Sequence, residues 1–251
     1  MRPQTIPAAL DARLAADPAR PFITFYDDAT GERVELSVAT YANWVSKTAS
    51  LLVDELDAER GDLVLVDLPT HWTGAVWLGA AWACGLCVTD EPERAGSAAV
   101  VVCGPGTVER YAALAADRPV VALSLRPLGG RFTDPLPAGV TDYGAVVLAQ
   151  PDVFVAPDPP SAGDAALRDG SRTLTQADLL AAAADGALIE AGDRLLTDVH
   201  PCSSEGVGLL ASALAVGGSL VWVAAPDADV WERHREDERV TAERRATQPR
   251  S

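Results

Sequence analysis

The hydrophobic and polar positions of residues 61–90 predict the unit around which the rest of the chain is arranged. Residues 63–68 read LVLVDL, a nearly continuous apolar run that is typical of a buried strand. The helix that follows carries Trp72, Trp77 and Trp82 around its circumference, so it has no polar face to present to water. A second short apolar run comes after this helix. A strand–helix–strand unit buried on all sides predicts an α/β fold with a mainly parallel sheet covered by helices on both faces.

The N-terminal segment predicts two helices and a hairpin. Apolar residues at helical spacing indicate a helix over residues 5–16 and a second, amphipathic helix over residues 40–56. Between them, residues 21–27 (PFITFYD) and 33–37 (RVELS) have the composition of strands, and a turn with Gly31 joins them. Because glycine readily adopts the positive φ of hairpin turns, we expect an N-terminal antiparallel hairpin.

Segments rich in proline and glycine divide the chain. We expect residues 1–150 to form a first α/β half, residues 151–170 a Pro-rich linker or crossing, residues 171–226 a second βα segment, and residues 227–251 a charged tail that forms a solvated helix. Within these segments the pattern predicts strands over residues 97–103, 119–124, 194–199 and 219–225, helices over residues 107–116, 173–184 and 205–216, and a surface loop over residues 126–142.

The acidic composition narrows the classes of partner. The 251 residues include 20 Lys and Arg against 36 Asp and Glu, which gives a net charge of -16. Such a surface repels phosphate backbones and anionic lipids, so we expect neither nucleic acid nor a membrane as a partner. Lys47 is the only lysine, whereas enzymes that transfer phosphoryl or adenylyl groups usually place a lysine on phosphate. The sequence shows no membrane-length apolar run and no signal-peptide pattern, so we expect a cytoplasmic protein.

The cysteine pattern does not specify a metal or redox site. Cys84 and Cys87 form a CxxC at the C-terminal end of a predicted helix, where the helix dipole disfavours a reactive thiolate. A zinc site would need two further ligands, and no second CxxC or HxxxH supplies them. We therefore expect buried structural thiols, and we identify neither a metal ligand nor a catalytic residue.

Two short features mark a candidate binding edge. Gly104 and Gly106 lie between a predicted strand and a predicted helix, where backbone N–H groups can hold an anionic cofactor, although a plain turn has the same pattern. His71 follows the buried strand of residues 63–68, at the carboxyl edge of a parallel sheet where ligands tend to bind. His71 is therefore a candidate substrate-binding residue, although a single histidine without a partner does not define a site.

The order of these pieces resembles the start of the acyl-adenylate-forming enzymes, also called AMP-dependent synthetases and ligases. The resemblance begins with FITFYDDATGERVELS, continues through a helix opening with Thr40-Tyr41 and through GDLVLVDLPTHWTGAVWLGAAWACG, and extends over GDRLL and HPCSSEGVGLLASALAVGGSLVWV to ERVTAER. It implies the N-terminal domain of an acyl-CoA synthetase-like protein. His200 then stands where the family places a histidine beside its acyl pocket, although the order is His-Pro rather than Pro-x-His. A loop histidine with a satisfied hydrogen bond is the alternative.

The chain departs from this family where nucleotide should bind. The resemblance places a Ser/Thr/Gly-rich phosphate loop that ends in a lysine between a strand near Ala145 and a helix near Leu174. That interval has no glycine-rich run and no lysine, and it contains acidic residues. The chain also ends before the family's adenine and ribose motifs and before its C-terminal domain with the catalytic lysine. The resemblance thus implies a truncated N-terminal domain without the nucleotide machinery.

Three functions remain open on these grounds. We expect first a degenerate AMP-dependent synthetase-like protein that is not an enzyme and that binds a small molecule or a protein. The first alternative is an active acyl-adenylate-forming ligase, acyl-CoA synthetase-like, that uses a partner chain or an atypical site. ATP or AMP with Mg would be a cofactor only if nucleotide binding survives. The second alternative is a structural subunit that forms a homo-oligomer, or binds a protein partner, through exposed core surface.

Overall fold

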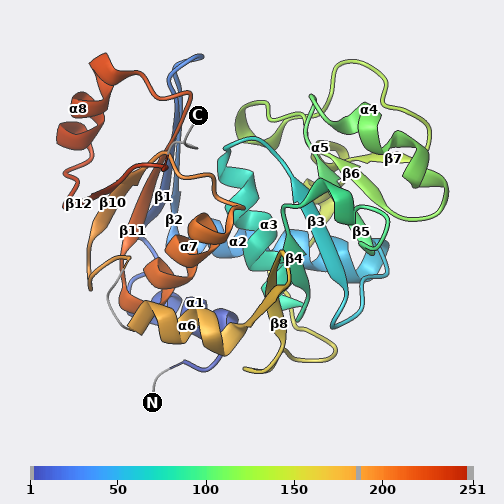
Figure 1. Ribbon diagram of the computed structural model, residues 1–251, viewed down its shortest axis with the longest axis horizontal. Coiled ribbons are helices and arrows are strands. Elements are labelled where there is room, and N and C mark those ends of the chain that lie inside the picture. The colour runs from blue at the N-terminus through green and yellow to red at the C-terminus, as the bar shows by residue number, and fades with distance from the viewer. Residues whose placement is uncertain (1–2, 185–187, 248–251) are drawn as a thin grey trace.

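Two β-sheets face each other across a layer of helices in the computed structural model of the chain, which describes residues 3–184 and 188–247 (Figure 1). Sheet A has the order β12-β10-β11-β1-β2, with β1 (Pro21–Asp27), β2 (Glu32–Ser37), β10 (Arg194–Thr197), β11 (Ser219–Ala224) and β12 (Ala242–Arg244). Sheet B has the order β7-β6-β5-β3-β4-β8-β9, with β3 (Leu63–Asp67), β4 (Cys87–Thr89), β5 (Val100–Cys103), β6 (Val120–Ala122), β7 (Val140–Asp142), β8 (Ala165–Asp169) and β9 (Arg172–Thr175). The neighbouring strands are parallel except in the hairpins β1–β2 and β8–β9.

Helices cover both faces of each sheet. The central layer holds α1 (Ile6–Ala16), α2 (Val38–Ser50, continued by a π-helical turn at Leu51–Glu55), α3 (Trp72–Ala83), α6 (Gln176–Ala184) and α7 (Ser204–Val216). In this layer α3 contacts β1 of sheet A as well as β3 and β4 of sheet B. α8 (Ala228–Asp237) packs on the outer face of sheet A, and α4 (Val108–Tyr111) packs on the outer face of sheet B. The predicted α/β architecture with an N-terminal antiparallel hairpin is confirmed.

Helix α3 is buried from Trp72 to Trp82, as its apolar circumference predicts. It approaches α2 closely at Gly79, where an added Cβ would lie 2.4 Å from the Tyr41 hydroxyl oxygen and 2.8 Å from a Val45 methyl carbon. The Tyr41 hydroxyl donates a hydrogen bond to the Ala75 carbonyl at 3.0 Å. A side chain at position 79 would therefore separate the two helices.

Strand β3 explains why parallel strands in this fold are apolar on both faces. Val64 and Val66 point into the central helical layer, whereas Leu65 belongs to the cluster on the other side of sheet B, with Val101 and Tyr111. Successive side chains of a strand point to opposite faces, so a strand with helices on both faces needs apolar residues throughout.

The hairpin β8–β9 corrects two boundaries predicted from the sequence. β8 begins at Ala165, inside the expected linker of residues 151–170, and residues 173–175 form a strand rather than the first turn of a helix. Gly170 has a φ of 57° in the two-residue turn between the strands. Helix α6 starts only at Gln176 because the Thr175 hydroxyl accepts the Asp178 N–H while the Asp178 carboxylate accepts the Thr175 N–H.

The charged tail is integrated into sheet A rather than solvated throughout, which corrects a second expectation. Its helix α8 packs Trp231 against Val221 and Val223, and the following strand β12 pairs in parallel with β10. Sheet A therefore combines strands from residues 21–37 with strands from residues 194–244, so both ends of the chain contribute to one sheet. β7 was also missed, because it is a three-residue strand at the end of the expected loop 126–142.

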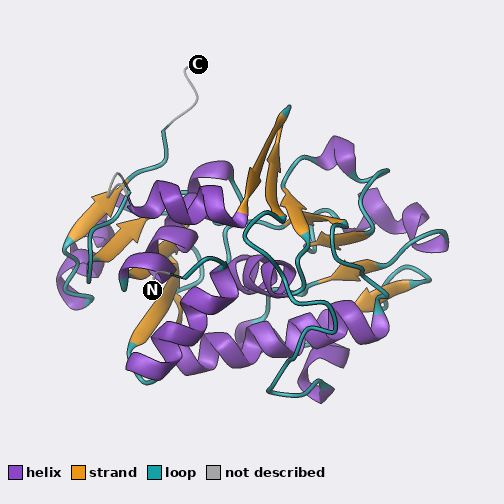
Figure 2. Cartoon of the chain, turned by 90° about the horizontal axis from the view of Figure 1, so that it is seen from below, coloured by secondary structure: helices purple, strands orange, loops and turns teal. Residues whose placement is uncertain are grey.

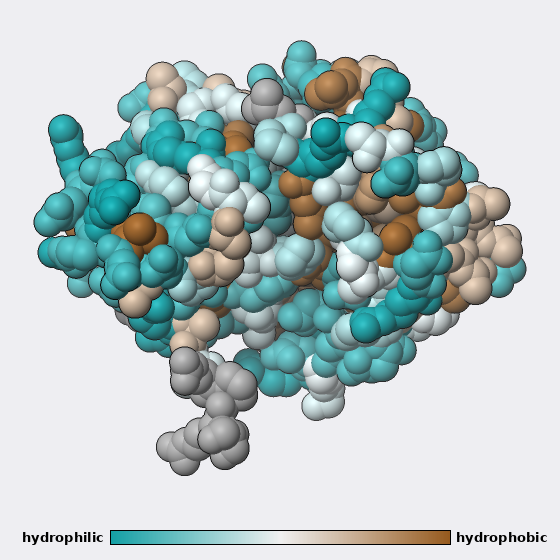
Figure 3. Space-filling view, turned by 90° about the horizontal axis from the view of Figure 1, so that it is seen from above, coloured by the Kyte–Doolittle hydropathy of each residue, from teal (hydrophilic) through white to brown (hydrophobic). Residues whose placement is uncertain are grey.

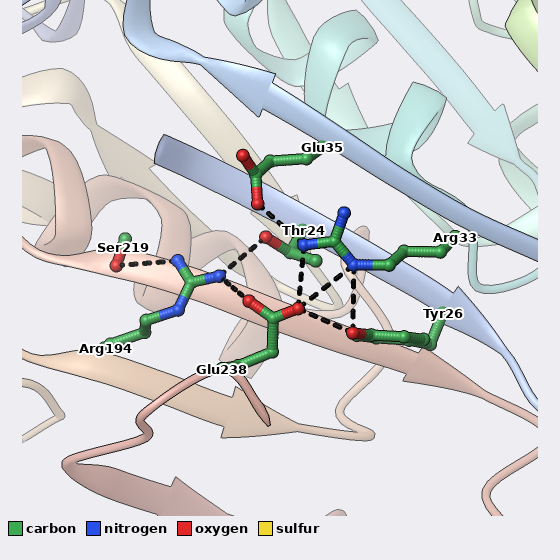
Figure 4. Close-up of polar contacts among 7 residues, drawn as sticks. All are labelled: Thr24, Tyr26, Arg33, Glu35, Arg194, Ser219 and Glu238. Atoms are coloured by element: carbon green, nitrogen blue, oxygen red, sulfur yellow. Dashed lines mark hydrogen bonds and ion pairs between the residues drawn. The ribbon is translucent and has the colours of Figure 1, made fainter. Parts of the chain in front are cut away.

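A buried carboxylate attaches the tail to the outer face of sheet A (Figure 4). The Glu238 side chain, 6% exposed, accepts hydrogen bonds from Tyr26 and Arg33 on one oxygen and from Arg194 on the other. Arg194 also donates to Thr24 at 2.8 Å. Burial would raise the pKa of Glu238, but these donors outweigh it and hold the pKa below its usual value.

We expect Gly79→Ala to lower the free energy of unfolding by about 1–3 kcal/mol, because overpacking against Tyr41 and Val45 outweighs the gain in helix propensity. Urea unfolding followed by far-UV circular dichroism measures the difference. Gly96→Ala is the matched control, since an added Cβ there meets nothing within 4 Å. Equal stability of the two variants would mean that α2 and α3 can separate without cost.

We expect Glu238→Gln to destabilise the protein by about 1–3 kcal/mol at pH 7, because it leaves the partly buried Arg194 guanidinium without its carboxylate. A lowered folded-state pKa stabilises the fold above the unfolded pKa of about 4.3, and this contribution disappears as pH falls through the folded value. The melting temperatures of wild type and variant should therefore converge below about pH 4. The exposed neighbour variant Glu236→Gln should show neither effect.

Candidate functional site

Three of the four residues predicted from the sequence gather at the turn after β3. His71 belongs to this turn, the His200 ring bonds to its Leu68 carbonyl, and a Cβ on Gly104 would lie 3.1 Å from the Pro69 ring. The turn lies at the carboxyl edge of sheet B, where parallel strands commonly present ligand-binding residues. Gly106 is separate, because a Cβ placed on it would meet nothing within 4 Å.

His200 links the two sheets through its Nε2 and makes a local contact through its Nδ1. Nε2 donates to the Leu68 carbonyl at 2.7 Å, and Nδ1 accepts the Cys202 N–H at 3.2 Å. A carbonyl can only accept and an amide N–H can only donate, so these partners specify the neutral tautomer with its proton on Nε2. The His200 carbonyl in turn accepts the Ser203 hydroxyl, which caps α7. These contacts match the alternative of a loop histidine whose hydrogen bonds are satisfied within the protein. A ligand-binding role for His200 stays a prediction.

His71 caps helix α3 from a buried position. Its Nδ1 accepts the Thr73 N–H at 3.3 Å and lies 2.7 Å from the Thr73 hydroxyl. Burial is the main cause that lowers the pKa of His71 to about 4, so the ring is neutral at physiological pH. Its Nε2 has no partner among the described residues and adjoins a cavity of about 10 Å³. That volume suits one water molecule rather than a substrate, so substrate binding at His71 stays a prediction.

The glycine turn at residues 104–106 offers little to an anion. The Gly104 N–H is donated to the Thr107 hydroxyl at 3.2 Å, and the helix that follows has only four residues. Beside it, the Asp67 carboxylate accepts a hydrogen bond from Tyr111 at 2.6 Å. A bound anion would face this negative charge and a weak helix dipole. Cofactor binding by Gly104 and Gly106 therefore also stays a prediction.

Acidic residues continue along the same edge of sheet B. Asp90 follows β4, where burial raises the pKa of its half-buried carboxyl. Glu91 follows Asp90 and pairs with Arg94. Seen from above (Figure 3), the surface is largely hydrophilic, with hydrophobic side chains gathered near its middle. In the sequence these acids are visible only as an Asp-Glu pair after a strand. Their proximity to Gly170 arises because β4 pairs with β8 in the folded chain.

The interval that should hold a phosphate loop ends in the hairpin turn Gly170-Ser171. The Glu91 carboxylate accepts the Gly170 N–H at 2.6 Å, and Arg94 donates to the Gly170 carbonyl. A phosphate loop binds its ligand through free backbone N–H groups and a lysine. The connection between β8 and β9 is a two-residue turn, and the Glu91 carboxylate of the chain itself already accepts the Gly170 N–H.

The described part of the chain contains neither a cluster of metal-binding side chains nor a cysteine pair placed for redox chemistry. Within residues 3–184 and 188–247, no group of three or more His, Cys, Asp or Glu side chains is placed to hold a metal ion. Cys84 and Cys87 are buried and unpaired with each other, as expected for structural thiols. Burial raises the pKa of Cys84 to about 12. None of the described helices is long and apolar enough to cross a lipid bilayer.

Known structures share this arrangement of two sheets and a central helical layer. An acyl-CoA synthetase from Brucella canis matches with a TM-score of 0.77 at 17% identity, over 94% of this chain and 47% of that protein. The N-terminal domain of FACL13 from Mycobacterium tuberculosis matches with a TM-score of 0.72 at 16% identity, over 95% of this chain and 62% of that one. Acetoacetyl-CoA synthetase from Streptomyces lividans matches with a TM-score of 0.77 at 18% identity, over 96% of this chain and 42% of that protein.

The chain therefore has the fold of the N-terminal part of acyl-CoA synthetases, which confirms the resemblance, and it spans about half the length of the whole enzymes it matches. No family model matches the sequence. A TIGR03089 family protein from Mycobacterium tuberculosis is 40% identical over 252 residues, which cover 93% of this chain and 95% of the relative. The protein belongs to the TIGR03089 family.

We expect His200→Ala to lower the free energy of unfolding by about 1–3 kcal/mol, because it leaves the Leu68 carbonyl and the Cys202 N–H without their partner. Urea unfolding measures this loss, with Glu109→Gln on the exposed side of α4 as the control. Unchanged stability would contradict a structural role and leave ligand binding as the explanation for this histidine.

Proposed function

We propose that the protein is a non-catalytic binding protein that uses the acyl-CoA synthetase fold without its ATP chemistry. The observation that carries the proposal is the hairpin turn Gly170-Ser171, whose Gly170 N–H is donated to Glu91. Adenylate formation requires the triphosphate to be held while the acid attacks, and backbone N–H groups and a lysine are the usual means. This turn supplies neither.

The electrostatics of the strand edge support the same proposal. Asp67, Asp90 and Glu91 lie at or near the ends of β3 and β4, in a chain with a net charge of -16. The one lysine, Lys47, lies on α2 and is engaged by the Gln150 carbonyl and by the Asp152 carboxylate at 3.1 Å. The arginines at this edge, Arg94 and Arg110, are already paired with Glu91 and Asp67, so a triphosphate would have to compete with these carboxylates for them.

An enzyme completed by a second chain is the competing function. The whole solved enzymes that match this fold are about twice as long, since the chain covers 47% and 42% of two of them. A partner chain that supplied the remaining part would also have to supply the phosphate-binding groups. Activity that appears only on addition of such a chain would favour this function over the non-catalytic one.

We expect Mg-ATP, AMP and coenzyme A to leave the melting temperature of the protein unchanged at millimolar concentration. A ligand at a hundredfold excess over its dissociation constant would add about 2.7 kcal/mol of stability, which is readily measured. Glu91→Ala removes the competing charge and frees the Gly170 N–H, so any gain of phosphate affinity should appear in this variant and not in the exposed control Glu93→Ala. Saturable ATP binding by the wild type, or ATP–pyrophosphate exchange with any acid, would overturn the proposal.

A further inference from the structure

A largely apolar cavity lies in the central helical layer near the C-terminal end of α3, away from the carboxyl edge of sheet B. Its volume is about 290 Å³, close to the lower limit of roughly 300 Å³ for small-molecule sites. Helices α1, α2, α3 and α7 line it with residues that include Leu10, Leu14, Val45, Gly79 and Leu214. Figure 2 shows this side of the molecule, where loop segments cross the helices that fill its middle.

The cavity has one charged group, and it is negative. Among the described residues that line it, Asp11 on α1 is the only charged side chain, and it is exposed. The Tyr41 hydroxyl, which also lines the cavity, is used by the Ala75 carbonyl. The lining therefore favours a ligand with an apolar hydrocarbon portion and, beside Asp11, a positively charged group. A ligand with a carboxylate or phosphate group would face Asp11, and no described lining residue supplies a cation to pair with it.

A strap formed by residues 151–160 closes the cavity from outside. No backbone–backbone hydrogen bond involves the strap in the part of the chain that the structure describes. Ion pairs hold its two ends, from Lys47 to Asp152 at 3.1 Å and from Arg60 to Asp158 at 3.0 Å. Between these ends Val155 is 83% exposed, although it also borders the cavity. Between the ion pairs, the packing of Phe154 against the core holds the strap, without backbone–backbone hydrogen bonds to the described residues.

Phe154 of the strap separates this cavity from a second one. The second cavity, of about 340 Å³, shares Phe154 and Ala156 with the first and continues toward Cys84 and Arg60. The side chain of Phe154 thus forms a partition between two spaces under the same strap. Its size determines how long a chain the first cavity can hold before it meets the partition.

We propose that the cavity under the strap binds an amphiphilic amine, with its hydrocarbon chain among the helices and its ammonium group at Asp11. The assignment combines the apolar lining, the single carboxylate among the described lining residues and a strap over the cavity that makes no backbone–backbone hydrogen bond to them or to the rest of the described chain. It goes beyond the proposed function, because the cavity lies away from the strand edge and would bind its ligand whether or not nucleotide binds there.

The test is calorimetric titration of the protein with decylamine, 1-decanol and decanoate, each kept below its micelle concentration. We expect decylamine to bind most tightly, 1-decanol more weakly and decanoate least. Asp11→Asn should weaken decylamine about two- to fivefold and leave 1-decanol unchanged. Asp134→Asn, an exposed site outside the cavity, is the matched control. The proposed ammonium group at Asp11 would be wrong if decanoate bound as tightly as decylamine. It would also be wrong if Asp11→Asn and Asp134→Asn weakened decylamine binding equally.

The position of the chain is tested separately. Ala83→Leu fills the cavity from α3 and should weaken decylamine about tenfold in a variant whose circular dichroism spectrum and melting transition remain native-like. Phe154→Ala removes the partition and should shift the preferred chain from decylamine toward hexadecylamine. Unchanged affinity in Ala83→Leu together with unchanged chain-length preference in Phe154→Ala would place the ligand elsewhere and overturn the site. These outcomes do not depend on nucleotide binding.

Discussion

The burial of α3 between two sheets is the packing constraint on which the rest of the structure depends. The helix contacts β1 in sheet A and β3 and β4 in sheet B, so it holds the sheets at a fixed separation. Trp82 reaches further, since its indole N–H donates to the Ala166 carbonyl of β8 at 2.9 Å. Gly79 brings α2 into the same close layer. A helix with these contacts has no face left for water, and this explains why its sequence is apolar throughout.

The two ends of α3 have different chemical surroundings. At its N-terminus, His71 caps the helix beside the carboxyl ends of the strands, where His200 joins the sheets through the Leu68 carbonyl. At its C-terminal half, Gly79 and Ala83 border the cavity that lies between α1 and the strap. Gly79 permits the close approach of α2, whereas the small side chain of Ala83 leaves part of the neighbouring space unfilled.

The apolar pattern predicted most of the fold, and long-range pairing explains what it missed. A strand buried on both faces or a helix with three tryptophans is visible in a short window of sequence. That β12 pairs with β10, or that Arg194 finds Glu238, depends on segments that come together only in the folded chain. The hairpin at Gly170 has a Gly-Ser turn between two short strands, but the expectation of a helix over residues 173–184 took precedence. At the carboxyl edge of sheet B, the Asp90-Glu91 pair is visible in the sequence, but a carboxylate in a turn has the same pattern whether it is solvated or bonded to Gly170.

The hairpin β8–β9 is a short connection that contributes directly to the pairing of sheet B. Sheet B requires β8 to pair with β4 and β9 to pair with β8, and a two-residue turn satisfies both pairings. A long loop between these strands adds chain entropy to the cost of folding and contributes no core. Glu91 and Arg94 then bond the turn to the end of β4, which anchors it as a structural element. The hairpin is therefore part of the scaffold of sheet B, held in place by contacts within the chain.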